Sequence, residues 1–189
     1  MGREQRCRAV FLDRDNTLIA NDGDLGDPDA VRLIDGVAPV LARLAKAQWR
    51  LVVVSNQGGV ARGKFTEADV EAVNGRLADL LDEQSGIRGL IDRFYWCPFH
   101  PEGTVERYCH EHPWRKPRSG MLVQAGRDLG VDLDRSWIVG DQPRDVAAGR
   151  AAGCATILVS IDPAAIEAAQ PTDVVTTLAE AAEIILCRR

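Results

Sequence analysis

Two short apolar runs that stop abruptly at polar residues stand out along the chain. Residues 9–12 (AVFL) end at Asp13, and residues 51–54 (LVVV) end at Ser55, where a polar, glycine-containing stretch begins. Runs of this length and composition are typical of strands that a parallel sheet buries on both faces. The pattern therefore predicts two strands of a parallel sheet.

Helical spacing separates and follows these runs. Between them, four apolar residues recur at i, i+3, i+4 and i+7, which predicts a helix that crosses back over the sheet: Val37, Val40, Leu41 and Leu44. A second helix is predicted to begin at Thr66, because its hydroxyl and Asp69 have the spacing of a capping box. The apolar face of this second helix carries Val70, Val73, Leu77 and Leu80.

The same alternation continues through most of the remaining chain. Strands are predicted at residues 94–96, 137–139 and 156–159, and helices over residues 121–129 and 147–152. Strands that alternate with helices indicate an α/β fold. We expect a doubly wound, Rossmann-like parallel sheet with helices on both faces.

Length and spacing limit what can be added to this sheet. The chain has 189 residues, of which 46% are hydrophobic, which suits one domain of ordinary size. The interval from Asp13 to Ser55 has room for one helix and its connections. We therefore expect residues 1–189 to form a single domain with no large cap.

The charge balance narrows the range of partners. The formal net charge is -5 at pH 7, whereas nucleic acids and membrane surfaces are anionic and are bound by basic surfaces. No apolar run approaches the roughly 20 residues that span a bilayer, and residues 1–8 lack the apolar centre of a signal peptide. We expect a cytoplasmic protein that binds neither nucleic acid nor membrane. Its oligomeric state is left open, with a monomer as the simplest expectation.

Carboxylates follow the predicted strands at the edge where such sheets bind ligands. Asp13 and Asp15 lie two residues apart after the first strand, so an extended backbone would aim both at the same side. One carboxylate can attack phosphorus while its neighbour protonates the leaving oxygen and later takes a proton from water. We assign the nucleophilic role to Asp13 and the role of general acid and base to Asp15.

A carboxylate that approaches a phosphate needs compensating positive charge. At about 4 Å the repulsion is several kcal/mol even at an effective dielectric of about 20. Mg²⁺ removes this obstacle and takes carboxylate oxygens as ligands. The candidate ligands are Asp13 and Asp141, with Asp15 as a third, and Asp145 is expected to anchor the loop or the waters of the metal.

Fixed donors for a phosphoryl group come from two further places. Lys116 supplies positive charge, and Ser55 supplies a hydroxyl next to backbone amides. Arg62 and Lys64 precede the second helix and are interpreted as solvated charges outside the site.

Together these motifs resemble the haloacid dehalogenase (HAD) superfamily of phosphatases. Four of its motifs occur in order: an apolar strand followed by DRDNT (13–17), a strand-end Ser55, Lys116 and GDQPRD (140–145). Finer features resemble the subfamily of heptose 1,7-bisphosphate 7-phosphatases and histidinol phosphatases: SNQ (55–57), ARGKF (61–65), Cys97-Pro98 and RKP (115–117). The resemblance implies an Mg²⁺-dependent phosphatase that acts on a small phosphorylated metabolite.

The resemblance also implies which residues contact the substrate: Asn21, Asp22, Gly23, Asp24, Ser55, Asn56, Gln57, Gly58, Arg115 and Lys116. It points to the 7-phosphate of D-glycero-D-manno-heptose 1,7-bisphosphate as the group removed. Two positions depart from the subfamily pattern: Asn16 stands where glycine is common, and Gln142 stands where heptose phosphatases often carry lysine.

A loop rich in cysteine and histidine departs further. In the subfamily it binds zinc through C-x-H and a later C-x-C directly before Arg-Lys-Pro, but here Phe99 and Trp114 occupy two of those places. A structural Zn²⁺ would need a rebuilt tetrahedral set: Cys97, His100, Cys109 and His112. Apolar packing is the alternative, through Phe99, Tyr108, Pro113 and Trp114. The other cysteines, Cys7, Cys154 and Cys187, show no partner signature.

Three alternative functions remain compatible with the motifs. Histidinol phosphate or another small sugar phosphate would use the same catalytic residues. An acceptor other than water would use the same aspartyl-phosphate. A phosphate-binding scaffold without turnover would belong to another class, but such a protein has no need to keep both Asp13 and Asp15.

Overall fold

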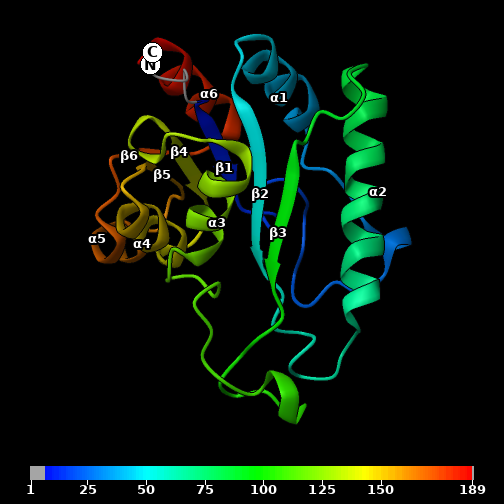
Figure 1. Ribbon diagram of the computed structural model, residues 1–189. Coiled ribbons are helices and arrows are strands. Elements are labelled where there is room, and N and C mark those ends of the chain that lie inside the picture. The colour runs from blue at the N-terminus through cyan, green and yellow to red at the C-terminus, as the bar shows by residue number, and fades with distance from the viewer. Residues whose placement is uncertain (1–6, 189) are drawn as a thin grey trace, which may run out of the picture.

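A six-stranded, all-parallel sheet organises the computed structural model, which describes residues 7–188. The strands lie in the order β3-β2-β1-β4-β5-β6 (Figure 1). Their bounds are β1 Ala9–Leu12, β2 Arg50–Asn56, β3 Arg93–Cys97, β4 Trp137–Gly140, β5 Ala155–Val159 and β6 Asp173–Val175. Every neighbouring pair is parallel, from β3 with β2 to β5 with β6.

Helices cover both faces of the sheet. The α-helices are α1 Val37–Lys46, α2 Glu67–Ser85, α3 Gly120–Leu129, α4 Pro143–Ala152, α5 Pro163–Ala169 and α6 Leu178–Cys187. Three short 3-10 turns accompany them: η1 Pro28–Ala30, η2 Glu106–Tyr108 and η3 Leu133–Arg135. The core beneath α1, α2 and α6 and the core beneath α3 lie on opposite faces. The predicted doubly wound α/β fold is confirmed.

Alternation along β1 explains why both faces are covered. Val10 and Leu12 belong to the core beneath α1, α2 and α6, whereas Ala9 and Phe11 belong to the core beneath α3. All four side chains are fully buried, which is why this strand is an uninterrupted apolar run.

The observed elements differ from the predicted ones in their bounds. Strand β2 continues to Asn56, and α4 begins at Pro143, earlier than the expected residue 147. Helix α2 begins after Thr66 with the predicted capping box, but Leu81 is buried where the pattern had favoured Leu80, which is half-buried. None of the helices described by the structure is long and apolar enough to cross a membrane.

The strand order brings the polar strand ends together. Because β1 lies between β2 and β4, the residues after these three strands share one edge. The backbone N–H of Asp13 still pairs with the carbonyl of Val139, 2.9 Å away. The loop between β3 and α3 extends beyond the same edge (Figure 1), so Lys116 can enter the site from that side.

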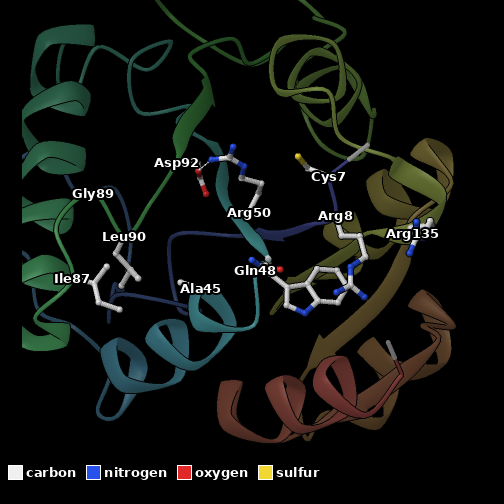
Figure 2. A pocket seen from close by; sticks show the side chains of 11 residues that line it. Cys7, Arg8, Ala45, Gln48, Arg50, Ile87, Gly89, Leu90, Asp92 and Arg135 are labelled. Carbon is white, nitrogen blue, oxygen red and sulfur yellow. Dashed lines mark hydrogen bonds and ion pairs between the residues drawn. The ribbon is translucent and has the colours of Figure 1, made fainter. Parts of the chain in front are cut away.

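A second hollow lies at the opposite edge, where β1 and β2 begin. Its volume is about 660 Å³, and its lining includes Arg8, Trp49, Arg50, Asp92 and Arg135. Figure 2 shows Arg50 joined to Asp92, with Arg8 and Arg135 on the other side of the hollow.

Candidate active site

A buried lysine and two buried aspartates form the centre of the site. The Lys116 ammonium Nζ lies 2.6 Å from Asp13 Oδ1 and 2.7 Å from Asp145 Oδ1. It also donates to the backbone carbonyl of Val54, 2.7 Å away. All three charged side chains are at most 5% exposed. Ions this deeply buried are stable only when they are paired and hydrogen-bonded, as here.

The pKa values of this group reflect its burial. Burial raises the pKa of Asp13 to about 6, although the neighbouring Lys116 ammonium opposes the rise. Burial alone would lower the pKa of Lys116, but the charges of Asp13 and Asp145 outweigh it and raise that pKa above its usual value. Lys116 is therefore a permanent positive charge beside Asp13.

Asp145 is held in place by the start of α4. Its Oδ2 accepts a hydrogen bond from the backbone N–H of Gln142 at 3.0 Å, which caps the helix that begins at Pro143. Gly140 makes the close approach possible, because a Cβ there would lie 2.4 Å from Asp145 Oδ2. The GDxxxD motif therefore packs so that the Asp145 carboxylate lies next to Lys116.

Three carboxylates lie close enough to share a cation. Oxygens of Asp13, Asp141 and Asp145 lie within 4.8 Å of one another, and they are the one such group of acidic, histidine or cysteine side chains in residues 7–188. Both oxygens of Asp145 are already engaged by Lys116 and Gln142. Asp145 Oδ1 has no hydrogen bond beyond its ion pair with Lys116, whereas Asp141 Oδ1 is buried with neither a hydrogen bond nor an ion pair among the described residues. Burial also raises the pKa of Asp141. Asp13 and Asp141 therefore fit the one or two carboxylates that Mg²⁺ usually takes.

The Asp15 carboxylate lies outside this acidic group. Its Oδ1 accepts from Asn21 Nδ2 at 2.7 Å, its Oδ2 accepts from Gln57 Nε2 at 2.9 Å, and Arg14 donates to both oxygens. These donors occupy the Asp15 side chain, so the arrangement gives no support to the prediction that this side chain binds the metal. The carboxylate is 23% exposed and faces the pocket described below.

The polar residues at the end of β2 hold the catalytic loops together. Asn56 Nδ2 donates to the Lys116 carbonyl and Asn56 Oδ1 accepts from the Lys116 N–H, both at 2.9 Å. Gln57 Nε2 donates to the Ser55 hydroxyl at 2.7 Å. Ser55 and Gln57 are buried, so these two predicted substrate contacts lie beneath the surface of the pocket.

A pocket of about 610 Å³ opens above these groups. Seven of the predicted substrate contacts line it: Asn21, Asp22, Gly23, Asp24, Asn56, Gly58 and Arg115. Lys116, like Ser55 and Gln57, does not belong to its lining. Asp15 and Asp141 do line it, which puts the expected acid and one expected metal ligand at its floor.

Two arginines that the sequence analysis did not assign also line the pocket, Arg62 and Arg144. Burial lowers the pKa of Arg115, and the positive charges of Arg144 and Arg62 lower it further. Arg62 and Lys64 both bind Asp24, at 2.5 and 2.7 Å. The interpretation of Arg62 as a solvated charge outside the site is therefore corrected, because Arg62 lines the pocket. Lys64 is exposed, as interpreted, although its ammonium pairs with Asp24. Their sequence signal was the ARGKF stretch (61–65), which follows the polar end of β2.

Aromatic packing holds the loop between β3 and α3. Phe99 stacks on His112 with ring centroids 4.3 Å apart and meets Tyr108 edge-on at 5.6 Å. Trp114 packs edge-on against Tyr95. This agrees with the packing alternative from the sequence.

The rebuilt zinc set has no support within residues 7–188. Its four members form no close group there, and side-chain polar atoms of three of them have other partners. His100 Nδ1 accepts from the Glu102 N–H, His112 Nδ1 accepts from the Trp114 N–H, and Cys109 lies beside the Pro101 carbonyl.

Comparisons with known proteins agree with the motifs. A family model described as HAD-hydrolase-like matches residues 113–181. The chain is 41% identical to the D-glycero-beta-D-manno-heptose-1,7-bisphosphate 7-phosphatases of Salmonella typhi and Escherichia coli K12 over 149 residues, which are 78% of this chain and 77% and 76% of theirs. A crystal structure of D,D-heptose 1,7-bisphosphate phosphatase from B. bronchiseptica, complexed with magnesium and phosphate, aligns with a TM-score of 0.82 and 30% identity, over 96% of this chain and 99% of that one. The chain belongs to the HAD-like phosphatases, in the family of the heptose 1,7-bisphosphate 7-phosphatases.

Proposed function

We propose that this protein is an Mg²⁺-dependent phosphatase that removes the 7-phosphate of D-glycero-D-manno-heptose 1,7-bisphosphate through an aspartyl-phosphate on Asp13. One observation carries the proposal: Asp13 is buried and paired with Lys116, and its neighbours Asp15 and Asp141 line a pocket whose wall carries three arginines. The first feature suits phosphoryl transfer, and the second suits a substrate with a further anionic group. We also propose that residues 1–189 act as one domain.

In the first half-reaction Asp13 is the nucleophile. Its carboxylate oxygen forms a bond to phosphorus while the bond from phosphorus to the leaving sugar oxygen breaks. Asp15, in its protonated form, gives its proton to that oxygen, so the sugar leaves as an alcohol. Lys116, fixed beside Asp13 and Val54, stabilises negative charge that spreads over the phosphoryl oxygens.

In the second half-reaction Asp15 acts as a base. It takes a proton from a water molecule whose oxygen bonds to phosphorus, and the acyl phosphate bond to Asp13 breaks. Inorganic phosphate leaves, Asp13 is again a carboxylate and Asp15 is again protonated, so protons and charge balance over the cycle. Mg²⁺ bound by Asp13 and Asp141 would offset the repulsion between the carboxylate and the phosphate.

The pocket wall favours a bisphosphate over histidinol phosphate. The positive charges of Arg144 and Arg62 both act on Arg115, and such a cluster is relieved by an anion. Asp24 neutralises part of it through Arg62 and Lys64, which leaves Arg115 and Arg144 as the proposed partners of the second phosphate. Histidinol phosphate would instead bring an ammonium group toward these arginines.

A substrate panel tests the proposal. Phosphate release is measured from heptose 1,7-bisphosphate, sugar monophosphates and histidinol phosphate, with Mg²⁺ or with EDTA. We expect Mg²⁺-dependent turnover with the highest kcat/KM on the heptose bisphosphate. A clear preference for histidinol phosphate would reject the substrate and keep the mechanism. Absence of phosphate release from every member, with Mg²⁺ present, would reject the mechanism.

A further inference from the structure

We propose that Arg14 and Asn74 are positioning residues that hold the Asp15 carboxylate toward the leaving oxygen and the attacking water. The inference rests on the proposed function, because it assigns a purpose to the group that would serve as acid and base. Arg14 is the middle residue of the DRD motif, and Asn74 lies on α2, which is distant in the sequence.

The contacts of Arg14 define the plane of the Asp15 carboxylate. Arg14 Nε donates to Asp15 Oδ2 at 3.3 Å, and Arg14 Nη2 donates to Asp15 Oδ1 at 3.1 Å. The remaining nitrogen of the guanidinium is held by α2, where Arg14 Nη1 donates to Asn74 Oδ1 at 3.1 Å. A planar fork that binds both oxygens fixes a carboxylate in a way that a single donor cannot.

The burial of Arg14 shows that this contact is not a casual surface pair. Arg14 is fully buried, and Asn74 is 7% exposed. Burying a guanidinium has a desolvation cost that an ion pair seldom recovers in full, so an apolar side chain of similar volume would serve stability as well or better. The presence of a buried arginine at position 14 is therefore explained by its two hydrogen bonds to Asp15 and not by a contribution to stability.

The Asp15 carboxylate faces the pocket on its exposed side, and this explains why its orientation needs to be fixed. Arg14 is buried, whereas Asp15 lines the pocket. Asn21 and Gln57 each donate to one Asp15 oxygen and limit its rotation further. An acid and base acts only when its oxygen is aimed at the proton it transfers, and small displacements of such a group lower rates strongly. Arg14 and Asn74 fix the orientation of the Asp15 carboxylate without touching the substrate.

Substitutions at both positions test the inference. We would compare wild type with Arg14→Met, Arg14→Lys and Asn74→Leu, using the best sugar phosphate of the panel and p-nitrophenyl phosphate. Arg50→Lys is the matched control, because Arg50 pairs with Asp92 at the opposite edge of the sheet. Thermal unfolding shows that each variant is folded, and Asn74→Leu keeps the test possible if Arg14→Met does not fold.

We expect kcat on the sugar phosphate to fall about 100-fold in Arg14→Met, within the usual contribution of a positioned acid and base. The loss should be smaller in Arg14→Lys and Asn74→Leu, with KM nearly unchanged in all three. Nitrophenolate leaves without a proton, so its first turnover should stay close to wild type. The following steady state should be slow, because water attack on the aspartyl-phosphate still needs the base. These variants should therefore release a burst of nitrophenolate before the slow steady state, and this burst distinguishes a misplaced Asp15 from a general defect.

Three results would overturn the inference. One is an equal loss of the first-turnover rate and of sugar phosphate turnover, which a general structural defect would cause. Another is a further loss when Arg14→Lys is added to Asp15→Asn, since a residue that acts through Asp15 has no effect once Asp15 is disabled. The last is that the Arg14 and Asn74 variants have the same kinetics as the control variant Arg50→Lys. If wild type itself releases no phosphate, the proposed function fails instead, so the two failures are distinct.

Discussion

The two hollows at opposite edges of the sheet are similar in size and differ in how their charges are satisfied. The hollow at the strand starts has about 660 Å³ and the pocket at the strand ends about 610 Å³. In the first, Arg50 binds Asp92 and Arg8 stacks over the Trp49 ring at 4.2 Å. Its one buried polar atom without a partner in the described chain is the neutral Trp49 Nε1.

At the strand ends the charges are arranged differently. A carboxylate oxygen of Asp141 is buried without a partner, Asp13 has a raised pKa, and Arg115 lies near two other arginines. Such groups are costly to the folded protein and become favourable when a cation and an anion bind. Unsatisfied charge, and not volume, therefore distinguishes the pocket at the strand ends from the hollow at the strand starts.

The largest expected effect comes from removing one carboxylate at each edge. Asp13→Asn should lower kcat about a thousandfold or more, because an amide is not a nucleophile here and no other group can replace it. Asp92→Asn should leave kcat within about twofold, because the partners of the Asp92 side chain within residues 7–188 are Arg50 and the Leu51 N–H. Steady-state phosphate release measures both. Equal losses in the two variants would remove the distinction between the edges.

A pair of glycine substitutions separates clash from backbone strain. In Gly140→Ala the added Cβ would displace Asp145, so stability should fall by about 1–3 kcal/mol and kcat should fall as Lys116 loses a partner. Gly89, in the other hollow, has φ +67 and open space around its Cα. Gly89→Ala should cost about 1 kcal/mol with unchanged kcat. Urea unfolding and kinetics measure the two effects, and an unchanged kcat in Gly140→Ala would contradict the role given to Asp145.

Metal binding should depend on pH at the strand ends only. A carboxylate must be ionised to bind Mg²⁺. Because the pKa of Asp13 is raised to about 6, Mg²⁺ must displace a proton below that pH. The rise in Tm caused by Mg²⁺ should therefore be clear at pH 8 and much smaller at pH 5. Asp141→Asn should remove this rise and Asp92→Asn should not; a rise of equal size at both pH values would contradict the assignment of Asp13 as a ligand.

In the metal-free protein, the effect of rising pH on stability should have the opposite sign. Because the folded-state pKa of Asp13 lies above the value of 3.8 for the unfolded chain, the folded state binds more protons between these pH values. The Asp13 contribution to stability in EDTA should therefore decrease as pH rises from about 4 to about 6. Thermal unfolding of wild type and Asp13→Asn over this range, with EDTA present, isolates that contribution. If the difference in Tm between them does not change with pH, Asp13 is not perturbed.

Much of the fold could be predicted because its signals are local. The run at residues 9–12 and the capping box at Thr66 each depend on neighbours in the sequence. The end of the chain was missed: β6 has three residues and α5 has seven, which is too short for a clear period. Helix α6 does carry buried residues at helical spacing, and that signal was present: Leu178, Ala181, Ala182 and Ile185.

The candidate site was predictable where strand ends determine it. The strand ends alone place Asp13 and Asp141 together. The contacts of Arg14 were not predictable, because alternation along a strand would direct Arg14 away from Asp15. Its long side chain returns to Asp15 only because Asn74, from another helix, supports it. Such a contact depends on tertiary packing that no local pattern contains.

The smallest expected effect concerns the second phosphate. Arg144 is exposed, so its contribution to substrate binding should be modest. Arg144→Ala should raise KM for the heptose bisphosphate about three- to tenfold and leave kcat nearly unchanged. This is the result expected for a contact that is made equally in the ground state and the transition state. KM for a sugar monophosphate should change less, because it lacks the anion that Arg144 would bind. Arg8→Ala, which removes an arginine from the other hollow, should change neither KM. If Arg144→Ala affects both substrates equally, the arginine wall acts on the transferred phosphate, and specificity for a bisphosphate must come from elsewhere in the pocket.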